Sequence, residues 1–328
     1  MKRRLSPAGW YGVGMRENAL LQHIYAAGVA GPAGSVAIPP GDDMGGLAFG
    51  DRLVLITVDQ LVEHVHFLPH PRTPLERIAR KAVNRNLSDV AAMAARPRGA
   101  VVAALLHRAT PDDEANALFD AMRAVAESFD CPLVGGDIAG HDGPMTLTVT
   151  VLAEPAGVEP VLRSTARVGD AVCVTGELGG SLLEDDHGCV HHLDFTPRLD
   201  AARTLADQPG IRPTAMIDLS DGLAADLPRV CDASHVSAEI DLAALPVRRV
   251  AVDHARHHGR PAWRAAVGDG EDYELLFTAD PARVPTEAAG VSVTRIGTIT
   301  PRGYAAVRWL DRGEPVTLDD AAGWEHRG

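Results

Sequence analysis

Acidic residues recur along this chain in glycine-containing turns or at the ends of short apolar runs. They include the pair Asp42-Asp43, Asp59, Asp137, the turn 218–222 and the pair Glu271-Asp272. Repeated carboxylates of this kind are typical of a site for hard cations, because Mg²⁺ prefers oxygen ligands and usually bridges carboxylates to substrate phosphates. The pattern therefore predicts a fold that brings the acidic segments together for phosphoryl chemistry.

Two of the acidic sites, the pair Asp42-Asp43 and the single residue Asp89, also have a simpler explanation. Two aspartates such as Asp42-Asp43 form Asx turns without any metal, and a lone aspartate on a helix, such as Asp89, is usually solvated. Asp89, however, lies with Asn86 and Ser88 in a polar cluster within an otherwise apolar run. The recurrence of acidic groups favours the metal site in both cases.

The composition restricts the partners of the chain. Its 328 residues are 46% apolar and 23% charged, which is ordinary for a soluble protein of two domains. The net charge of -13, with no run of Lys and Arg after the first four residues, argues against a nucleic-acid partner. No apolar stretch of about eighteen residues occurs, so we expect no membrane span. The four cysteines form no C-x-x-C pair, and together with the lack of a signal-like apolar segment this favours a cytoplasmic protein.

Apolar periodicity predicts strands and helices in alternation in the first half. The strict alternation at 145–152 is the clearest strand, and Glu154-Pro155 after it marks a domain boundary. The other expected elements are a helix near 14–30, a strand at 54–58 that delivers Thr57 and Asp59 at its carboxyl end, a helix at 74–95, a strand at 101–106, a helix capped by Thr110, and a short strand at 133–134 that stops at a turn holding Gly136 and Asp137.

The second half restarts a similar order, with strands expected at 171–175, 215–217, 273–278 and 291–296. Its glycine-rich loop, 176–181, is not a P-loop, because no Lys-Ser or Lys-Thr pair follows the glycines. We expect Ser220 to cap the next helix and Pro228 to kink or shorten it. The segment 185–194 contains His and Cys in no known zinc spacing, so a surface loop is the simpler interpretation.

The collinear order of these motifs closely resembles the thiamine-monophosphate kinase family, from Gly41 to Trp324. The motifs that carry the resemblance are Gly-Asp-Asp (41–43), Thr-x-Asp-x-Leu-Val-Glu-x-Val-His-Phe (57–67), Lys-Ala-Val-x-x-Asn-Leu-Ser-Asp (81–89), Gly-Gly-Asp (135–137), Val-Gly-Asp (168–170), Ile-Asp-Leu-Ser-Asp-Gly-Leu (217–223) and Gly-Glu-Asp-Tyr-Glu-Leu-Leu-Phe (270–277).

The resemblance implies an α/β fold of two domains like that of aminoimidazole ribonucleotide synthetase, with a first domain at 1–154, a second at 155–328, and a homodimer formed through the N-terminal sheets. It implies phosphorylation of thiamine monophosphate to the diphosphate by direct transfer from ATP with Mg²⁺. The implied Mg²⁺ ligands are Asp43, Thr57, Asp59, Asp89, Asp137, Asp218 and Asp221. The implied ATP contacts are Gly136, Asp137, Arg163 and Ser220, and the implied acceptor contacts are His66, Glu271 and Trp324.

The chemistry of such a reaction agrees with the sequence independently. A phosphomonoester has a second pKa near about 6, so its oxygen is already a nucleophile at neutral pH and needs no general base. The difficulty lies in bringing two polyanions together, which metal ions held by carboxylates make possible. A chain with many acidic turns and no obvious Ser-His or Cys-His arrangement fits that requirement.

The sequence also departs from the family pattern. Val58 stands where the family usually has Thr, His64 replaces a usual Gly, and Asp269 replaces the first Gly of the Gly-Gly-Glu-Asp motif. The segment 181–198 replaces a helix of small residues. These differences bear on the fit of the substrate more than on the fold.

Two other interpretations remain open. One is another ATP-dependent member of the wider group, such as a phosphoribosyl-amidine cyclase, a selenophosphate synthetase or the hydrogenase-maturation dehydratase. The last two are disfavoured, because neither residues 1–40 nor the residues after Trp324 contain the cysteine that their chemistry requires. The other is a protein that binds nucleotide or metal without turnover, for which the departures are the only support.

Overall fold

The computed structural model describes residues 20–21, 23–25, 34–208 and 211–318. The helix expected near 14–30 lies largely outside these residues, although the five described there are helical. Trp324 also lies outside them. None of the described helices is both long and apolar enough to cross a membrane.

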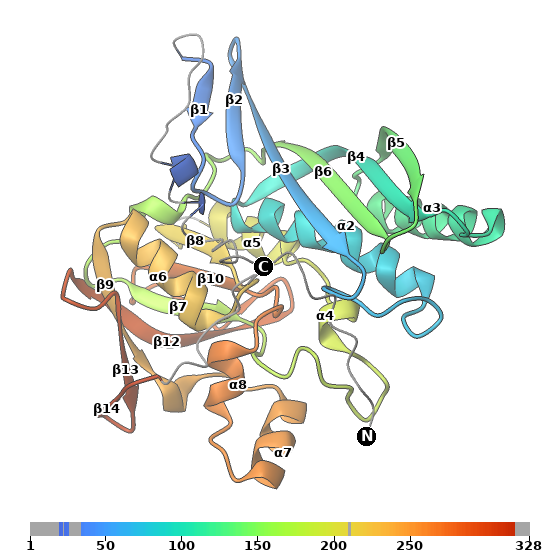
Figure 1. The fold of residues 1–328 in the computed structure, drawn as a ribbon. Coiled ribbons are helices and arrows are strands. Elements are labelled where there is room, and N and C mark those ends of the chain that lie inside the picture. The colour runs from blue at the N-terminus through green and yellow to red at the C-terminus, as the bar shows by residue number, and fades with distance from the viewer. Residues whose placement is uncertain (1–19, 22, 26–33, 209–210, 319–328) are drawn as a thin grey trace.

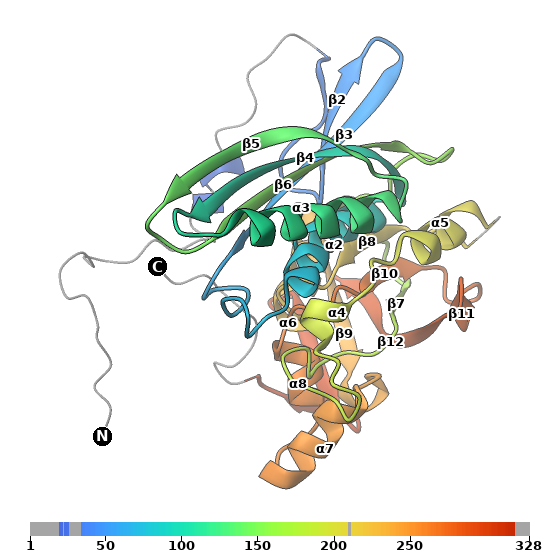
Figure 2. The same ribbon diagram turned by 90° about the vertical axis from the view of Figure 1, so that its right-hand side faces the viewer.

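The first sheet has six strands in the order β1-β2-β3-β6-β4-β5, antiparallel except for the β4–β5 pair. Its helices, α2 and α3, lie along the same face of the sheet (Figure 2). The strands are β1 (Val36–Ile38), β2 (Gly45–Phe49), β3 (Arg52–Val62), β4 (Ala95–His107), β5 (Leu133–His141) and β6 (Thr146–Pro155), and the helices are α2 (Leu75–Ala92) and α3 (Asp112–Glu127).

The predicted alternation at 145–152 is confirmed by β6. Leu147, Val149 and Val151 are fully buried on the face toward the helices, and the threonines between them are half-buried on the other face. We call that other face, which neither α2 nor α3 covers, the outer face. The first sheet is therefore apolar on both faces but covered by helices on one.

The second sheet follows the order β14-β13-β9-β12-β7-β10-β8, with β11 paired to β12. Its strands are β7 (Ala171–Thr175), β8 (Ala215–Asp218), β9 (Val236–Asp241), β10 (Leu275–Ala279), β11 (Glu287–Ala288), β12 (Val291–Pro301), β13 (Val307–Asp311) and β14 (Glu314–Val316). The helices of this half are α4 (His191–Asp194), α5 (Leu199–Asp207), α6 (Leu223–Ala233), α7 (Arg249–His258) and α8 (Trp263–Gly268), with 3-10 turns η1 (Arg163–Thr165) and η2 (Leu242–Ala244).

Helix α2 lies between the two sheets (Figure 1). It contacts β3, β4 and β6 of the first sheet as well as β8, α4 and α5 of the second half. Strand β7 shows the same layering, because Ala171 and Cys173 enter the core shared with α2 while Val172 and Val174 enter a second core with α6. A helix packed on both sides must bury most of its circumference, which explains why Asn84, Asn86 and Ser88 are buried in α2.

Several predicted strands are longer than expected, and two of them, β3 and β5, carry implied site residues. β3 continues past Asp59 because β6 pairs with it as far as Val62, so Asp59 lies within a strand and not after one. β5 continues through Gly135-Gly136-Asp137 because β4 pairs with it, so the expected turn is wrong. A Cβ on Gly136 would lie 2.0 Å from the carbonyl oxygen of Val102. The glycine therefore permits the close approach of β5 to β4.

The expected helix ends also need correction. α3 begins at Asp112 with Pro111 as its N-cap and no side-chain capping bond, so Thr110 is not the cap. α6 has Gly222 as its N-cap, at φ 99°, a conformation that glycine adopts without strain, and Ser220 caps nothing. Pro228 does not end α6, because the helix runs on to Ala233 with Val230 and Cys231 buried in the second core.

Candidate functional site

Three carboxylates converge where α2 meets the second sheet. Asp43 precedes β2, Asp89 lies near the end of α2, and Asp218 is the last residue of β8. One ligand oxygen from each lies within 4.8 Å of the other two, which we call the carboxylate cluster. Three of the implied metal ligands, separated by up to 175 residues of sequence, are thus brought together by the fold.

Hydroxyl groups hold two of these carboxylates in place. Thr57 Oγ1 donates to Asp89 Oδ2, and Ser88 Oγ donates to Asp218 Oδ2 at 2.6 Å. Thr57, an implied ligand, therefore reaches the cluster from β3. The sequence did not predict a role for Ser88. The only feature that could have indicated one is its position next to Asp89.

The electrostatics of the carboxylate cluster favour a bound cation. Burial, followed by the charges of Asp59, Asp218 and Asp43, raises the pKa of Asp89 well above its usual range. Burial and then the charge of Asp43 raise the pKa of Asp218 to about 7. Buried carboxylates that repel one another are stabilised by a metal ion, and three oxygen donors fit a hard cation such as Mg²⁺. The donor set therefore suits the implied metal.

Arg163 lies against the cluster from η1. Its Nη2 and Nε contact the two carboxylate oxygens of Asp43 at 2.7 and 3.1 Å, and its Nη1 donates to the carbonyl of Gly41 at 3.3 Å. Its backbone N–H donates to Asp42 Oδ2 at 3.2 Å. Burial and the charge of Asp43 nevertheless raise the pKa of Asp42 to about 6. The guanidinium thus fixes the whole turn that carries Asp43.

Asp59 lies on the same face of β3 as Thr57 and is paired to a cation that sequence reasoning missed. Arg85, one helical turn before Asp89, contacts Asp59 Oδ1 at 3.5 Å and donates to the carbonyl of Gln60 at 2.9 Å. Asp59 is therefore close enough to raise the pKa of Asp89, but it is outside the group of three.

Asp221 is positioned by an ion pair on α6 between the buried Asp226 and the partly exposed Arg229. Arg229 Nη2 contacts Asp221 Oδ2 at 2.6 Å and Arg229 Nη1 contacts Asp226 Oδ1 at 2.5 Å. Asp226 Oδ2 accepts the backbone N–H of Asp221 at 3.0 Å. Asp226 was not predicted, and its only sequence signal is an aspartate facing the apolar side of a helix. The backbone carbonyl of Ser220, an implied ATP contact, accepts the N–H of Glu271 at 2.7 Å.

Asp137 does not join the cluster. Asp137 lies in β5, where it pairs with Ala103 of β4. Ala103 pairs in turn with Thr148 of β6, and Thr148 pairs with Gln60 of β3, so the four residues form one row across the sheet. Paired residues share a face of a sheet, and this row lies on the outer face, away from α2. The structure therefore separates Asp137 from the other implied ligands within one chain.

The implied acceptor residues His66 and Glu271 are linked by a buried lysine. Lys81 Nζ donates to the carbonyl of His66 at 2.9 Å and contacts Glu271 Oε1 at 2.6 Å. Burial alone would raise the pKa of Glu271, but its contact with His192 and the charge of Lys81 hold that pKa at about 2. Glu271 is therefore ionised at neutral pH.

The departures from the family pattern lie at different places. Val58 is exposed on the outer face, His64 is in a left-handed conformation at φ 68°, and Asp269 Oδ2 accepts the N–H of Gly180 at 2.7 Å. The segment 181–198 forms a loop with the short helix α4. Within the described residues, no His or Cys of 185–194 belongs to a group that could hold a metal.

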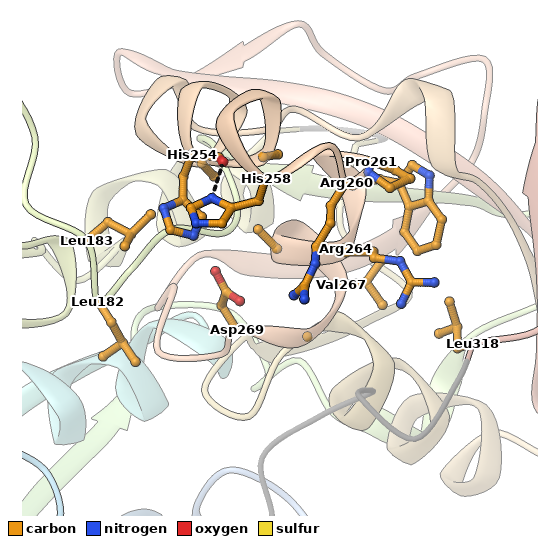
Figure 3. A pocket seen from close by; sticks show the side chains of 15 residues that line it. Leu182, Leu183, His254, His258, Arg260, Pro261, Arg264, Val267, Asp269 and Leu318 are labelled. Atoms are coloured by element: carbon orange, nitrogen blue, oxygen red, sulfur yellow. Dashed lines mark hydrogen bonds between the residues drawn. The ribbon is translucent and has the colours of Figure 1, made fainter. Parts of the chain in front are cut away.

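A separate cavity of about 590 Å³ lies between α7, α8 and the loop at Leu182 and Leu183 (Figure 3). The guanidinium groups of Arg260 and Arg264 extend into it, with Asp269 at the other side. It contains none of the implied metal or acceptor residues. We therefore place the chemistry at the carboxylate cluster, where the donor groups converge.

Known proteins match the chain over most of its length. Two family models match it, the N-terminal domain of AIR synthase related protein over residues 41–154 and the C-terminal domain of the same protein over residues 167–310. A thiamine-monophosphate kinase of Rhodopirellula baltica is 36% identical over 247 residues, covering 74% of this chain and 75% of that protein. The corresponding kinase of Synechococcus elongatus is 33% identical over 326 residues, covering 94% of each.

Solved structures agree with these matches. The structure of AaThiL complexed with AMPPCP and TMP superposes on this chain with a TM-score of 0.78 at 27% identity, covering 95% of this chain and 97% of the other. The two-domain fold of the AIR synthase related proteins is thereby confirmed.

The carboxylate cluster predicts that Asp89→Asn keeps the fold and loses the response to metal. The amide oxygen still accepts from Thr57, and repulsion within the cluster falls, so in EDTA the Tm of the variant should equal or exceed that of the parent. Mg²⁺ at a hundred times its Kd adds about 2.7 kcal/mol to the parent, a rise of roughly 5 °C in Tm. Differential scanning fluorimetry of both proteins, with and without Mg²⁺, measures these shifts.

The matched control for this experiment is Asp142→Asn, which removes an exposed carboxylate with no part in the cluster. It should respond to Mg²⁺ as the parent does. A full Mg²⁺ response in Asp89→Asn, together with a large fall of its Tm in EDTA, would contradict the metal site and make Asp89 a purely structural residue.

Proposed function

The chain belongs to the thiamine-monophosphate kinase family, and we propose that it transfers the γ-phosphoryl group of ATP to thiamine monophosphate, forming thiamine diphosphate and ADP. The observation that carries the proposal is the carboxylate cluster, which lies where the two halves of the chain meet and is contacted by Arg163, one of the implied ATP contacts. We expect the reaction to take place in the cytoplasm.

The residues of the cluster have proposed roles. Asp43, Asp89 and Asp218 would hold Mg²⁺, with Thr57, Asp59 and Asp221 completing its surroundings. Bound Mg²⁺ would supply charge neutralisation for two groups of phosphate oxygens. Arg163 lies on the side of Asp43 from which it can also meet a phosphate oxygen, and Arg85 neutralises Asp59.

No general base is part of this proposal. The phosphate oxygen of the acceptor is already ionised at neutral pH, so positioning and charge neutralisation are what the protein must provide. Asp43 comes from the turn before β2, Asp89 from α2 and Asp218 from β8, so the fold would fix the relative positions of the two phosphate groups. Asp137 and Gly136 lie on β5, and their roles toward ATP are proposed from the family resemblance alone.

The acceptor is proposed to lie at Glu271 and not in the cavity between α7 and α8. Thiamine carries a positively charged thiazolium ring, and two guanidinium groups enter that cavity against one carboxylate. Like charges in a poorly solvated space repel. At Glu271 the carboxylate is paired with Lys81 at 2.6 Å, so no excess of positive charge repels the ring there.

A coupled assay tests the function directly. The purified chain with ATP, Mg²⁺ and thiamine monophosphate should produce ADP and thiamine diphosphate in equal amounts, and Arg260→Ala in the separate cavity should do the same. No thiamine diphosphate, with phosphorylation or cyclisation of a different phosphorylated small molecule, would move the chain to another member of the wider group. If no ADP forms with any acceptor, the result would favour a protein that binds nucleotide or metal without turnover.

We also propose that the chain is a homodimer that uses the outer face of the first sheet. This face exposes Ile56, Val58, Val101 and Leu152, between 38% and 58% accessible, on the three neighbouring strands β3, β6 and β4. A contiguous apolar patch on a sheet marks an interaction surface, and a second copy of the chain offers the same patch. Residues 1–154 and 155–328 are proposed as the two domains, with the first forming the interface.

The dimer predicts a selective effect of charge on the outer face. Val58→Asp places a carboxylate in the centre of the proposed interface, where it would lie unpaired and buried, so light scattering should return the mass of one chain. Val168→Asp, at an apolar residue with 57% exposure that lies off this sheet, is the control and should leave the dimer intact. A parent protein that is already monomeric at micromolar concentration would contradict the proposal.

A further inference from the structure

We propose that Lys81, Glu271 and His192 form one unit that recognises the amino-bearing heterocycle of the acceptor, with Lys81 as a positioning residue and His192 as a specificity-determining residue. We call these three residues the acceptor-binding unit. The inference rests on the proposed function, because it concerns the same acceptor.

Lys81 is fully buried in α2 and has three acceptors for its three protons. Its ammonium donates to the carbonyl of His66 at 2.9 Å, to Glu271 Oε1 at 2.6 Å and to His192 Nδ1 at 2.7 Å. Burial lowers the pKa of Lys81 to about 8, against the opposing charge of Glu271. A buried ammonium with every donor engaged is fixed in space, and it fixes the groups around it.

Glu271 is held at both its backbone and its side chain. It adopts φ 53°, an unfavourable conformation for a residue with a side chain, and its N–H donates to the carbonyl of Ser220. Lys81 and the hydroxyl of Tyr273 both contact its Oε1, the latter at 3.3 Å. The carboxylate is therefore presented in one orientation, with Oε2 turned toward His192 at 3.1 Å.

The contact with Lys81 also sets the tautomer of His192. His192 Nδ1 lies 2.7 Å from Lys81 Nζ and 3.1 Å from Glu271 Oε2. The shorter contact is with an ammonium, which can only donate, so Nδ1 accepts from Lys81, the ring proton is on Nε2, and Oε2 receives no proton from His192. Among the described residues, no partner is recorded for that Nε2. The side chains of Glu271 and His192 are 24% and 12% exposed, whereas Lys81 has no exposure. The side chains of Glu271 and His192 are therefore partly open to a ligand, to which they offer an acceptor and a donor, whereas Lys81 is not.

His192 is supplied by the segment in which this chain departs from its family. α4 is anchored by His191 Nε2, which lies 2.7 Å from the carbonyl oxygen of Asp272, and by an ion pair of Arg77 with Asp194 at 2.9 Å. Burial and the charge of Arg248 lower the pKa of His191 to about 4, so it is neutral and donates from Nε2. The segment 181–198 thus brings a histidine to Glu271 where the family has small residues.

The charges of the unit leave the phosphate to the other site. The ammonium of Lys81 and the carboxylate of Glu271 neutralise each other at 2.6 Å, so the unit does not attract the phosphate, which we expect to lie toward the carboxylate cluster and its cations. The aminopyrimidine of thiamine has an amino donor next to a ring-nitrogen acceptor, which complements Oε2 and Nε2–H. A buried site that pairs with a substrate N–H rejects the analogue that lacks it, because the polar groups of the site are then left unpaired.

The test compares thiamine monophosphate with oxythiamine monophosphate, in which the amino group is replaced by oxygen. The parent should have a kcat/KM at least tenfold lower for oxythiamine monophosphate. We call the kcat/KM for thiamine monophosphate divided by the kcat/KM for oxythiamine monophosphate the ratio. In His192→Ala and Lys81→Met this ratio should fall toward one, mainly through a higher KM for thiamine monophosphate, and the KM for ATP should be unchanged. His192→Asn, whose amide oxygen can accept from Lys81 but which lacks Nε2–H, should restore stability without restoring the ratio.

Arg260→Ala in the separate cavity is the control and should keep the ratio of the parent. If Lys81→Met does not fold, His192→Ala carries the test alone, because its side chain is partly exposed. An unchanged ratio in a folded His192→Ala overturns this inference and leaves the proposed function intact. A parent protein that makes no thiamine diphosphate overturns the proposed function, and this inference with it.

Discussion

The mutual repulsion of buried carboxylates is the constraint on which the rest of this structure depends. Asp43, Asp89 and Asp218 come within 4.8 Å of one another at the junction of the two halves, and burial with like charge raises the pKa of Asp89 and Asp218. Such a group is tolerated only when hydroxyls, guanidiniums or bound cations compensate it. Thr57, Ser88 and Arg163 supply part of that compensation. We propose that a metal ion supplies the remainder, so that the repulsion within the cluster and its proposed function have the same origin.

Helix α2 carries most of the arrangement. Four polar residues within nine positions of α2, Lys81, Arg85, Ser88 and Asp89, reach Asp59 in β3, Asp218 in β8 and Glu271 in the loop after α8. Because α2 packs between the two sheets, most of its polar groups are paired. Among the described residues, the amide oxygens of Asn84 and Asn86 and the Nε of Arg85 have no partner, so α2 carries both acceptors and a donor that its surroundings leave unpaired. The helix thus links the proposed metal site to the proposed acceptor site.

The sequence predicted the elements and the acidic residues better than it predicted their partners. The alternating strand at β6, the helix α2 and the strand β7 follow from local periodicity, and the aspartates stand out by repetition. Lys81, Arg85, Arg229 and Asp226 were missed, since a charged residue in a helix is usually solvated and only tertiary packing shows that Lys81 and Asp226 are buried and that Arg85 and Arg229 are partly buried. The same limit applies to Asp137, because the face on which it lies depends on the register of β5 with β4. The strand lengths were underestimated where pairing with neighbours extends a ladder past glycines.

The central claim is that the carboxylate cluster binds phosphates only through a cation, and the most direct test is the affinity for a non-hydrolysable ATP analogue as a function of free Mg²⁺. Calorimetry should show no measurable binding in EDTA, because the phosphates would meet ionised carboxylates. Affinity should then increase with free Mg²⁺, with a slope above one on logarithmic axes if more than one ion takes part. A Kd that is the same with and without Mg²⁺ would contradict the account, since the analogue would then be held by groups other than the cluster.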